Sequence, residues 1–249
     1  MKLARYAFSA LIVAPALALL ASASPASALS VAAFDNGWYD AGGSHTPGST
    51  NIVLSDPSGS GNNHFFAFDL SAVSGTVSYA VLHIFGANGN FLGTDATEDY
   101  AIYDYGGSID DLVNGTGGSA AFADLGSGTA YGNIVLSTFA AAGFGAMPDI
   151  SFLLPAAALS DINAAIASGD PRFAVGGTSA TLGTGQYLWH SSSFSVAAEL
   201  ELVFATTGGG DQDNLPVPAP GAFALFAAGV LPFGVMRARR RMRAGGTVS

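Results

Sequence analysis

Residues 199–204 read Glu-Leu-Glu-Leu-Val-Phe, and this stretch gives the clearest indication of the fold. Its apolar residues at 200, 202 and 204 alternate with Glu199 and Glu201. Successive side chains of a β-strand point to opposite faces of the sheet. The stretch therefore predicts a strand that buries one face in a core and keeps two carboxylates in water.

Other short stretches along the chain carry the same kind of signal, separated by clusters of Gly, Ser, Asn and Asp. They are 31–38, 51–54, 64–70, 77–85, 100–105, 130–136, 150–154, 173–175 and 186–190. Two short helices are expected at 108–113 and 160–167, with Ser108 and Ser160 as their caps. Many short strands with little helix favour a barrel or a sandwich. We therefore predict an all-β domain, a jelly-roll-like two-sheet β-sandwich.

Charge is distributed unevenly along the 249 residues. The region 29–216 holds all 18 acidic residues and one basic residue, Arg172, so its net charge is −17. The basic footprint that a nucleic-acid-binding protein needs is absent from this region. The chain has no Cys, which excludes a disulfide framework and a catalytic thiol.

The N-terminal end has the pattern of a secretory signal peptide. Lys2 and Arg5 precede an apolar stretch at 6–21, and the small residues Ala-Ser-Ala follow at 26–28. A membrane anchor is the alternative, but the apolar run is short for a crossing. We expect a signal peptide at 1–28, cleaved after Ala28, and an exported protein.

The C-terminal end contains a second apolar stretch. A Gly-rich and acidic linker at 206–216 joins the β-domain, 29–205, to a tail at 217–249. The apolar run, counted from Val217, is about 20 residues, the length of one membrane crossing. Arg residues follow it, which favours a cytoplasmic C-terminus. The tail therefore predicts a transmembrane helix at 222–236 with the β-domain outside.

This tail resembles the PEP-CTERM sorting signal of Gram-negative bacteria. The matching residues are Val217, Pro218, Pro220, Gly221, the apolar stretch 222–236, Arg239, Arg240 and Arg241. Ala219 stands where the family's motif has an acidic residue. The resemblance implies recognition by an exosortase-like membrane processing enzyme. It also implies attachment to the inner membrane before processing, then delivery to the cell surface or an exopolysaccharide matrix.

The middle of the chain resembles a β-domain common among PEP-CTERM proteins. The matching pieces are Phe-Asp-Leu-Ser at 68–71, Gly75, and the strand at 80–84. These motifs are structural, so the resemblance implies a fold and no particular activity.

A search for catalytic patterns finds none. The histidines His45, His64, His83 and His190 lack the spacing of metal ligands, and no Gly-x-Ser-x-Gly occurs. The carboxylate pairs at 110–111 and 199–201 suit a helix start and the wet face of a strand. We therefore predict no catalytic residues and a protein that is not an enzyme.

Calcium is the one candidate cofactor. Asp95, Glu98 and Asp99 put three carboxylates in one loop, and hard oxygen donors of this kind suit Ca²⁺. Asp35, Asn36 and Asp40 form a second oxygen-rich patch. A solvated acidic loop that keeps the protein soluble is the simpler interpretation of both.

These observations favour an exported cell-surface or matrix-associated structural or interaction protein. A carbohydrate-binding, lectin-like module, assisted by calcium, is the alternative, and a hydrolase of matrix polysaccharide is a third interpretation. The aromatic residues available for a sugar site are Trp38, Tyr39, Tyr103, Tyr105, Tyr187 and Trp189. Aromatic residues of β-proteins more often lie in the core or in cross-strand pairs.

Overall fold

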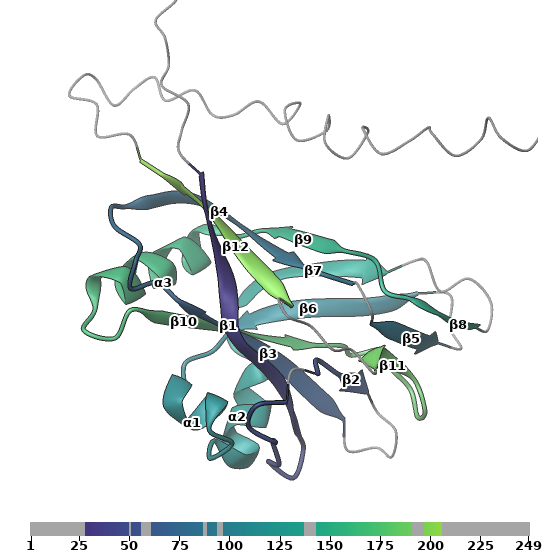
Figure 1. Cartoon of the computed structure of the whole chain (residues 1–249). Helices are drawn as coiled ribbons and strands as arrows, with labels where there is room; N and C mark the ends of the chain where they lie inside the picture. Colours follow the sequence, from purple (N-terminus) through teal and green to yellow (C-terminus); the bar gives the residue numbers. More distant parts are fainter. Residues whose placement is uncertain are drawn as a thin grey trace, which may run out of the picture. The chain divides into compact units, whose positions relative to one another are not determined.

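The computed structural model, shown in Figure 1, describes residues 28–49, 51–55, 61–86, 89–93, 97–136, 143–190 and 197–205. Of these residues 48% lie in strands and 16% in helices, which confirms the prediction of a mostly β protein with few helices. The predicted signal peptide up to residue 27, the linker and the tail lie outside the described residues. None of the described helices is long and apolar enough to cross a membrane.

Eight antiparallel strands form the main sheet, in the order β7-β6-β10-β3-β1-β12-β4-β9. Their bounds are β1 Ala28–Asp40, β3 Asn62–Asp69, β4 Val77–Ile84, β6 Glu98–Asp104, β7 Ala130–Leu136, β9 Ile150–Leu153, β10 Arg172–Thr178 and β12 Ala198–Phe204. β1 pairs with β12 as far as Ala32 and with β3 from Ala33 onward. The register shifts between Ala33 and Asp35, so β1 belongs to both halves of the sheet.

The sheet curves until its two edge strands approach each other (Figure 1). A Cβ added to Gly132 of β7 would lie 2.7 Å from the ring of Phe152 in β9. The two halves thereby face each other across one core, which contains Leu82 and Leu200 from one half and Phe66 and Ile102 from the other. The result is two layers of strands around a shared apolar interior.

The pattern of buried and exposed residues along each strand depends on what covers its two faces. Leu200 and Leu202 of β12 are fully buried while Glu199 and Glu201 are half-exposed, as the alternation predicted. β3 is apolar on both faces because both are covered. Phe66 and Phe68 enter the main core, whereas Phe65 and Ala67 enter a second, smaller one.

Two short helices cover the outer face at this second core. They are α1, Ile109–Val113, and α2, Gly118–Leu125. The apolar residues of this core are Tyr39, Phe65, Ala67, Leu112, Ala121, Leu125 and Ala174. Ser108 caps α1 as predicted, since its Oγ accepts the backbone N–H of Asp111 at 3.2 Å.

A third helix, α3 at Ala156–Ala167, places Ala158 and Ile162 in the main core. The prediction that it begins at Ser160 was wrong. It begins directly after Pro155, whose carbonyl accepts the Leu159 N–H at 3.1 Å and closes the first turn, so Ser160 lies inside the helix.

A small second sheet supplies the remaining part of the main core. Its strands, in order, are β2 Leu54–Ser55, β11 Tyr187–His190, β5 Asn90–Gly93 and β8 Gly143–Ala146. Leu54, Phe91, Leu188 and Trp189 are its contributions to the core. β5 and β8 were not predicted, because at least half of the residues in each are Gly, Ala or Asn, and α2 was missed because no side chain caps it.

Candidate functional site

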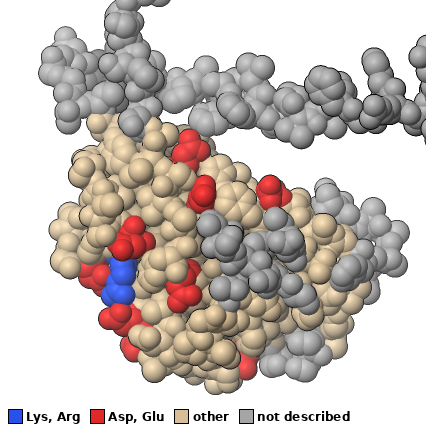
Figure 2. Space-filling model, in the orientation of Figure 1, with Lys and Arg blue, Asp and Glu red and all other residues tan. Residues whose placement is uncertain are grey.

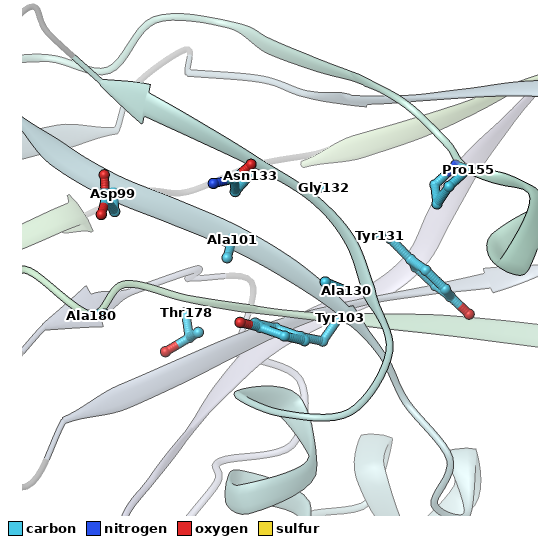
Figure 3. Close-up of a pocket in the computed structure, with 10 residues that line it drawn as sticks. All are labelled: Asp99, Ala101, Tyr103, Ala130, Tyr131, Gly132, Asn133, Pro155, Thr178 and Ala180. Atoms are coloured by element: carbon cyan, nitrogen blue, oxygen red, sulfur yellow. The ribbon is translucent and has the colours of Figure 1, made fainter.

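A groove of about 540 Å³ lies on the outer face of β6 and β7 (Figure 3). Strand alternation creates its floor, because Tyr100 and Ile102 of β6 point into the core while Ala101 and Tyr103 point outward. The residues that line it are Asp99, Ala101, Tyr103, Ala130, Tyr131, Gly132, Asn133, Pro155, Thr178 and Ala180. Its volume is in the range of small-ligand sites, about 300–1,000 Å³.

Small residues open the groove and polar ones surround it. Ala101 and Ala180 carry only a methyl group, which leaves room above the strands. Figure 3 shows the Tyr103 hydroxyl lying near the Thr178 side chain, with the Asn133 amide and the Asp99 carboxylate farther along the same hollow. The groove thus offers an aromatic face, two hydroxyls, one amide and one carboxylate.

Three of the polar side chains that line the groove do not stabilise the fold through hydrogen bonds. Within the described part of the chain, no hydrogen bond is made by the side chains of Tyr103, Asn133 or Thr178. Elsewhere polar side chains bind their own chain: Asn63 Nδ2 donates to the carbonyl of Phe122 at 2.9 Å. The groups in the groove are therefore available to a ligand.

Tyr131 closes one wall of the groove from the inside. It is 2% exposed, its ring stacks on Phe173, and its hydroxyl donates to the Asp161 carboxylate. Burial, together with this hydrogen bond, raises the pKa of the Tyr131 hydroxyl well above its usual value. Tyr131 is a fixed wall, whereas Tyr103 on the neighbouring strand is half-exposed.

The three predicted calcium ligands do not form a set in the described residues. Glu98 and Asp99 are neighbours on β6, but Glu98 is buried and Asp99 is exposed. Thr181 contacts both, since its hydroxyl donates to Glu98 Oε2 at 2.6 Å and accepts the Asp99 backbone N–H at 2.8 Å. Asp95 lies outside the described residues, so calcium binding there stays a prediction.

In the second oxygen-rich patch the carboxylates bind nearby backbone. Asp35 Oδ1 accepts the Asn36 N–H and Asp40 Oδ1 accepts the Ser44 N–H, each at 2.8 Å. Burial raises the pKa of Asp35. Across the described ranges, no group of three or more potential metal-ligating His, Cys, Asp or Glu side chains occurs.

Of the aromatic candidates for a sugar site, the structure places only Tyr103 in this groove. Tyr39 and Trp189 are fully buried in the two cores. Tyr187 packs against His190 with ring centroids 4.4 Å apart, and Trp38 is half-buried on β1. Tyr105 lines a separate hollow of about 500 Å³ beside α1 and α2.

One polar constellation was missed by sequence reasoning. Ser151 Oγ lies 2.9 Å from His83 Nδ1, and His83 Nε2 lies 3.1 Å from Glu201 Oε2. These residues come from β9, β4 and β12 and line neither hollow described above. We interpret the contacts among Ser151, His83 and Glu201 as cross-strand polar contacts on the face of the sheet.

The only Lys or Arg in the described ranges is already paired. Arg172 donates to Asp110 at 2.7 Å and twice to Asp170, at 2.5 and 2.7 Å. On the face shown in Figure 2 the single blue patch lies among red carboxylates. The hydrogen bonds and charge of Arg172 lower the pKa of both carboxyls. An anion approaching the domain would find no unpaired guanidinium or ammonium group on these residues.

No known family model matches the chain, and no curated protein shows significant similarity to it. The groove and the charge distribution are therefore the features that bear on function.

Proposed function

We propose that the protein is an exported, non-enzymatic interaction protein of the cell surface or extracellular matrix, directed there by its PEP-CTERM-like tail. One observation carries the proposal: the two ends of the β-domain are paired neighbours. Leu29 of β1, the first residue of the domain, lies opposite Leu202 of β12, and both strands reach the same end of the sheet (Figure 1). An N-terminal export signal and a C-terminal anchor can thus be attached without interrupting the domain.

We describe the architecture more finely as jelly-roll-like. Eight antiparallel strands arranged in two layers around one core support this description. In such an arrangement loops and the outer faces of strands are available for contacts, while the interior is filled.

The proposal is tested by comparing the localisation of the protein with and without the tail. Deleting 217–249 should release the protein from the membrane and surface fractions into the periplasm or medium. Replacing Val217, Pro218 and Pro220 together by Ala should block processing while membrane attachment is retained. An unchanged distribution of the deleted protein between these fractions would refute the sorting proposal.

Carbohydrate binding is the second candidate, and the groove beside Tyr103 favours it. Its aromatic face, hydroxyls and amide can pack against and hydrogen-bond a sugar. Among the described lining residues Asp99 is the only carboxylate. Glycoside hydrolysis generally needs two carboxyl groups flanking the bond, so the groove favours binding over cleavage.

This candidate is tested with a glycan array, with and without a chelator. Binding in both conditions would support a metal-independent site. Binding that is lost with the chelator would support the calcium-assisted form, and no binding in either condition would exclude the candidate.

A further inference from the structure

The charged and neutral side chains that line the groove beside Tyr103 also indicate the class of its ligand. This inference rests on carbohydrate binding, the second candidate function. Among the described residues that line the groove, Asp99 is the only charged one. Tyr103, Asn133 and Thr178 are neutral groups that can each donate and accept hydrogen bonds.

An acidic ligand would enter this groove without a partner for its charge. A carboxylate or sulfate that leaves water needs a cation or several hydrogen-bond donors to offset its lost hydration. The one Arg of the described residues, Arg172, is held by Asp110 and Asp170, and no described Lys exists. Asp99 would repel the anion further.

A neutral sugar matches the same groups. Its hydroxyls donate to Asp99 and to the carbonyl of the Asn133 amide, and they accept from Tyr103 and Thr178. Its apolar C–H face can pack on the half-exposed ring of Tyr103. The small residues Ala101 and Ala180 leave the space in which a ring can lie.

We propose that the groove between β6, β7 and the end of β10 binds an uncharged oligosaccharide and rejects acidic ones. Tyr103 supplies the packing surface. Asp99, Asn133 and Thr178 supply the hydrogen bonds.

The experiment is isothermal titration calorimetry on the full-length chain. The probes are three neutral hexasaccharides, cellohexaose, maltohexaose and mannohexaose, together with acidic hexagalacturonate and cationic chitosan hexamer. At least one neutral hexasaccharide should bind, and at least about 10-fold more tightly than hexagalacturonate. Failure of all three neutral probes to bind, or tighter binding of hexagalacturonate, would overturn the proposal. Chitosan binding tighter than every neutral probe would assign the groove to amino sugars and overturn it equally.

Variants locate the site. Tyr103→Ala should weaken binding about 10-fold, and Tyr103→Phe, which keeps the ring, should weaken it less. Tyr79→Ala is the matched control, because Tyr79 is a half-buried tyrosine on β4 that does not line the groove. Thermal unfolding of each variant checks that it is folded. Equal losses in Tyr103→Ala and Tyr79→Ala would show that the groove is not the site.

The outcomes separate this inference from the proposed function. If a neutral sugar binds but the Tyr103 variants bind normally, carbohydrate binding stands and the groove assignment fails. If no glycan binds while deletion of 217–249 still changes localisation, surface sorting stands and carbohydrate binding fails.

Discussion

The Tyr100 hydroxyl lies 2.7 Å from Nε2 of His64, inside the core and next to the backbone of Gly177. The ring of Trp189 packs against both, and its centroid lies 5.2 Å from that of the His64 ring and 5.0 Å from that of the Tyr100 ring. Burial lowers the pKa of His64 to about 3 and raises that of Tyr100 well above its usual value, so both stay neutral. A hydrogen bond between β3 and β6, the two neighbours of β10 in the sheet, thus lies inside the core.

Replacing Gly177 by Ala should destabilise the protein. The new Cβ would lie 2.1 Å from His64 Nε2 and 2.7 Å from the Tyr100 hydroxyl, too close for either group to remain in place. Overpacking of this kind costs about 1–3 kcal/mol of unfolding free energy. Urea denaturation measures it. Gly169→Ala, where nothing lies within 4 Å of the new Cβ, is the control and should change little.

Stability should fall as the pH drops below about 6.5. His64 has a pKa of about 3 when folded and 6.5 in an unfolded chain, so the unfolded state takes up a proton first. The contribution of neutral His64 to the free energy of unfolding is therefore fully present above pH 6.5. It is lost progressively toward pH 3, by up to about 1.4 kcal/mol per pH unit. Urea midpoints between pH 7 and pH 5, above the carboxylate range, detect it. His64→Gln should lose this part of the slope, and an unchanged slope would contradict the assignment.

Removing the one described guanidinium should raise the pKa of two carboxyls. Arg172 hydrogen-bonds to Asp110 and Asp170 and lowers both pKa values. In Arg172→Gln we expect both to return toward the ordinary value for Asp, as measured by NMR titration of the carboxyl carbons. Asp35, whose pKa is raised by burial, should titrate as before and serves as the internal control.

Tyr131→Phe should loosen the connection between β7 and α3. The substitution removes the hydroxyl that donates to Asp161 of α3 but keeps the ring stacked on Phe173. The loss of one hydrogen bond costs about 1 kcal/mol of unfolding free energy, and the charged acceptor places it toward the upper end of the usual range. Thermal unfolding measures the change. Stability equal to that of the parent protein would show that water replaces the bond.

Local patterns in the sequence predicted much of the fold. The strand predicted at 130–136 is β7 with the same bounds, and the alternation at 199–204 correctly assigned the faces of β12. α2 was missed because it has no side-chain cap, and β5 and β8 because at least half of the residues in each are Gly, Ala or Asn, which are depleted in strands. Such elements are stabilised mainly by tertiary packing, which a single sequence does not display.

The candidate site could not be located in this way. Its residues come from β6, β7, the end of β10 and Pro155, which are far apart in the chain. Tyr103 was one of six aromatic candidates, and nothing local distinguished it from the buried Trp189. The Ala residues that open the groove, Ala101 and Ala180, have no sequence signature, because small side chains occur throughout the chain.

The pairing of β1 with β12 has a consequence for the order of folding. The first half of β1 hydrogen-bonds to the last described strand, 167 or more positions away, as in the pair Val31 and Leu200 or Ala32 and Glu199. Contacts between such distant segments form late and slow the folding of a chain. A polypeptide that crosses a membrane N-terminus first, as proposed here, could not complete its sheet until nearly all of the domain had emerged. The topology itself would then leave the sheet open between β1 and β12 during its passage.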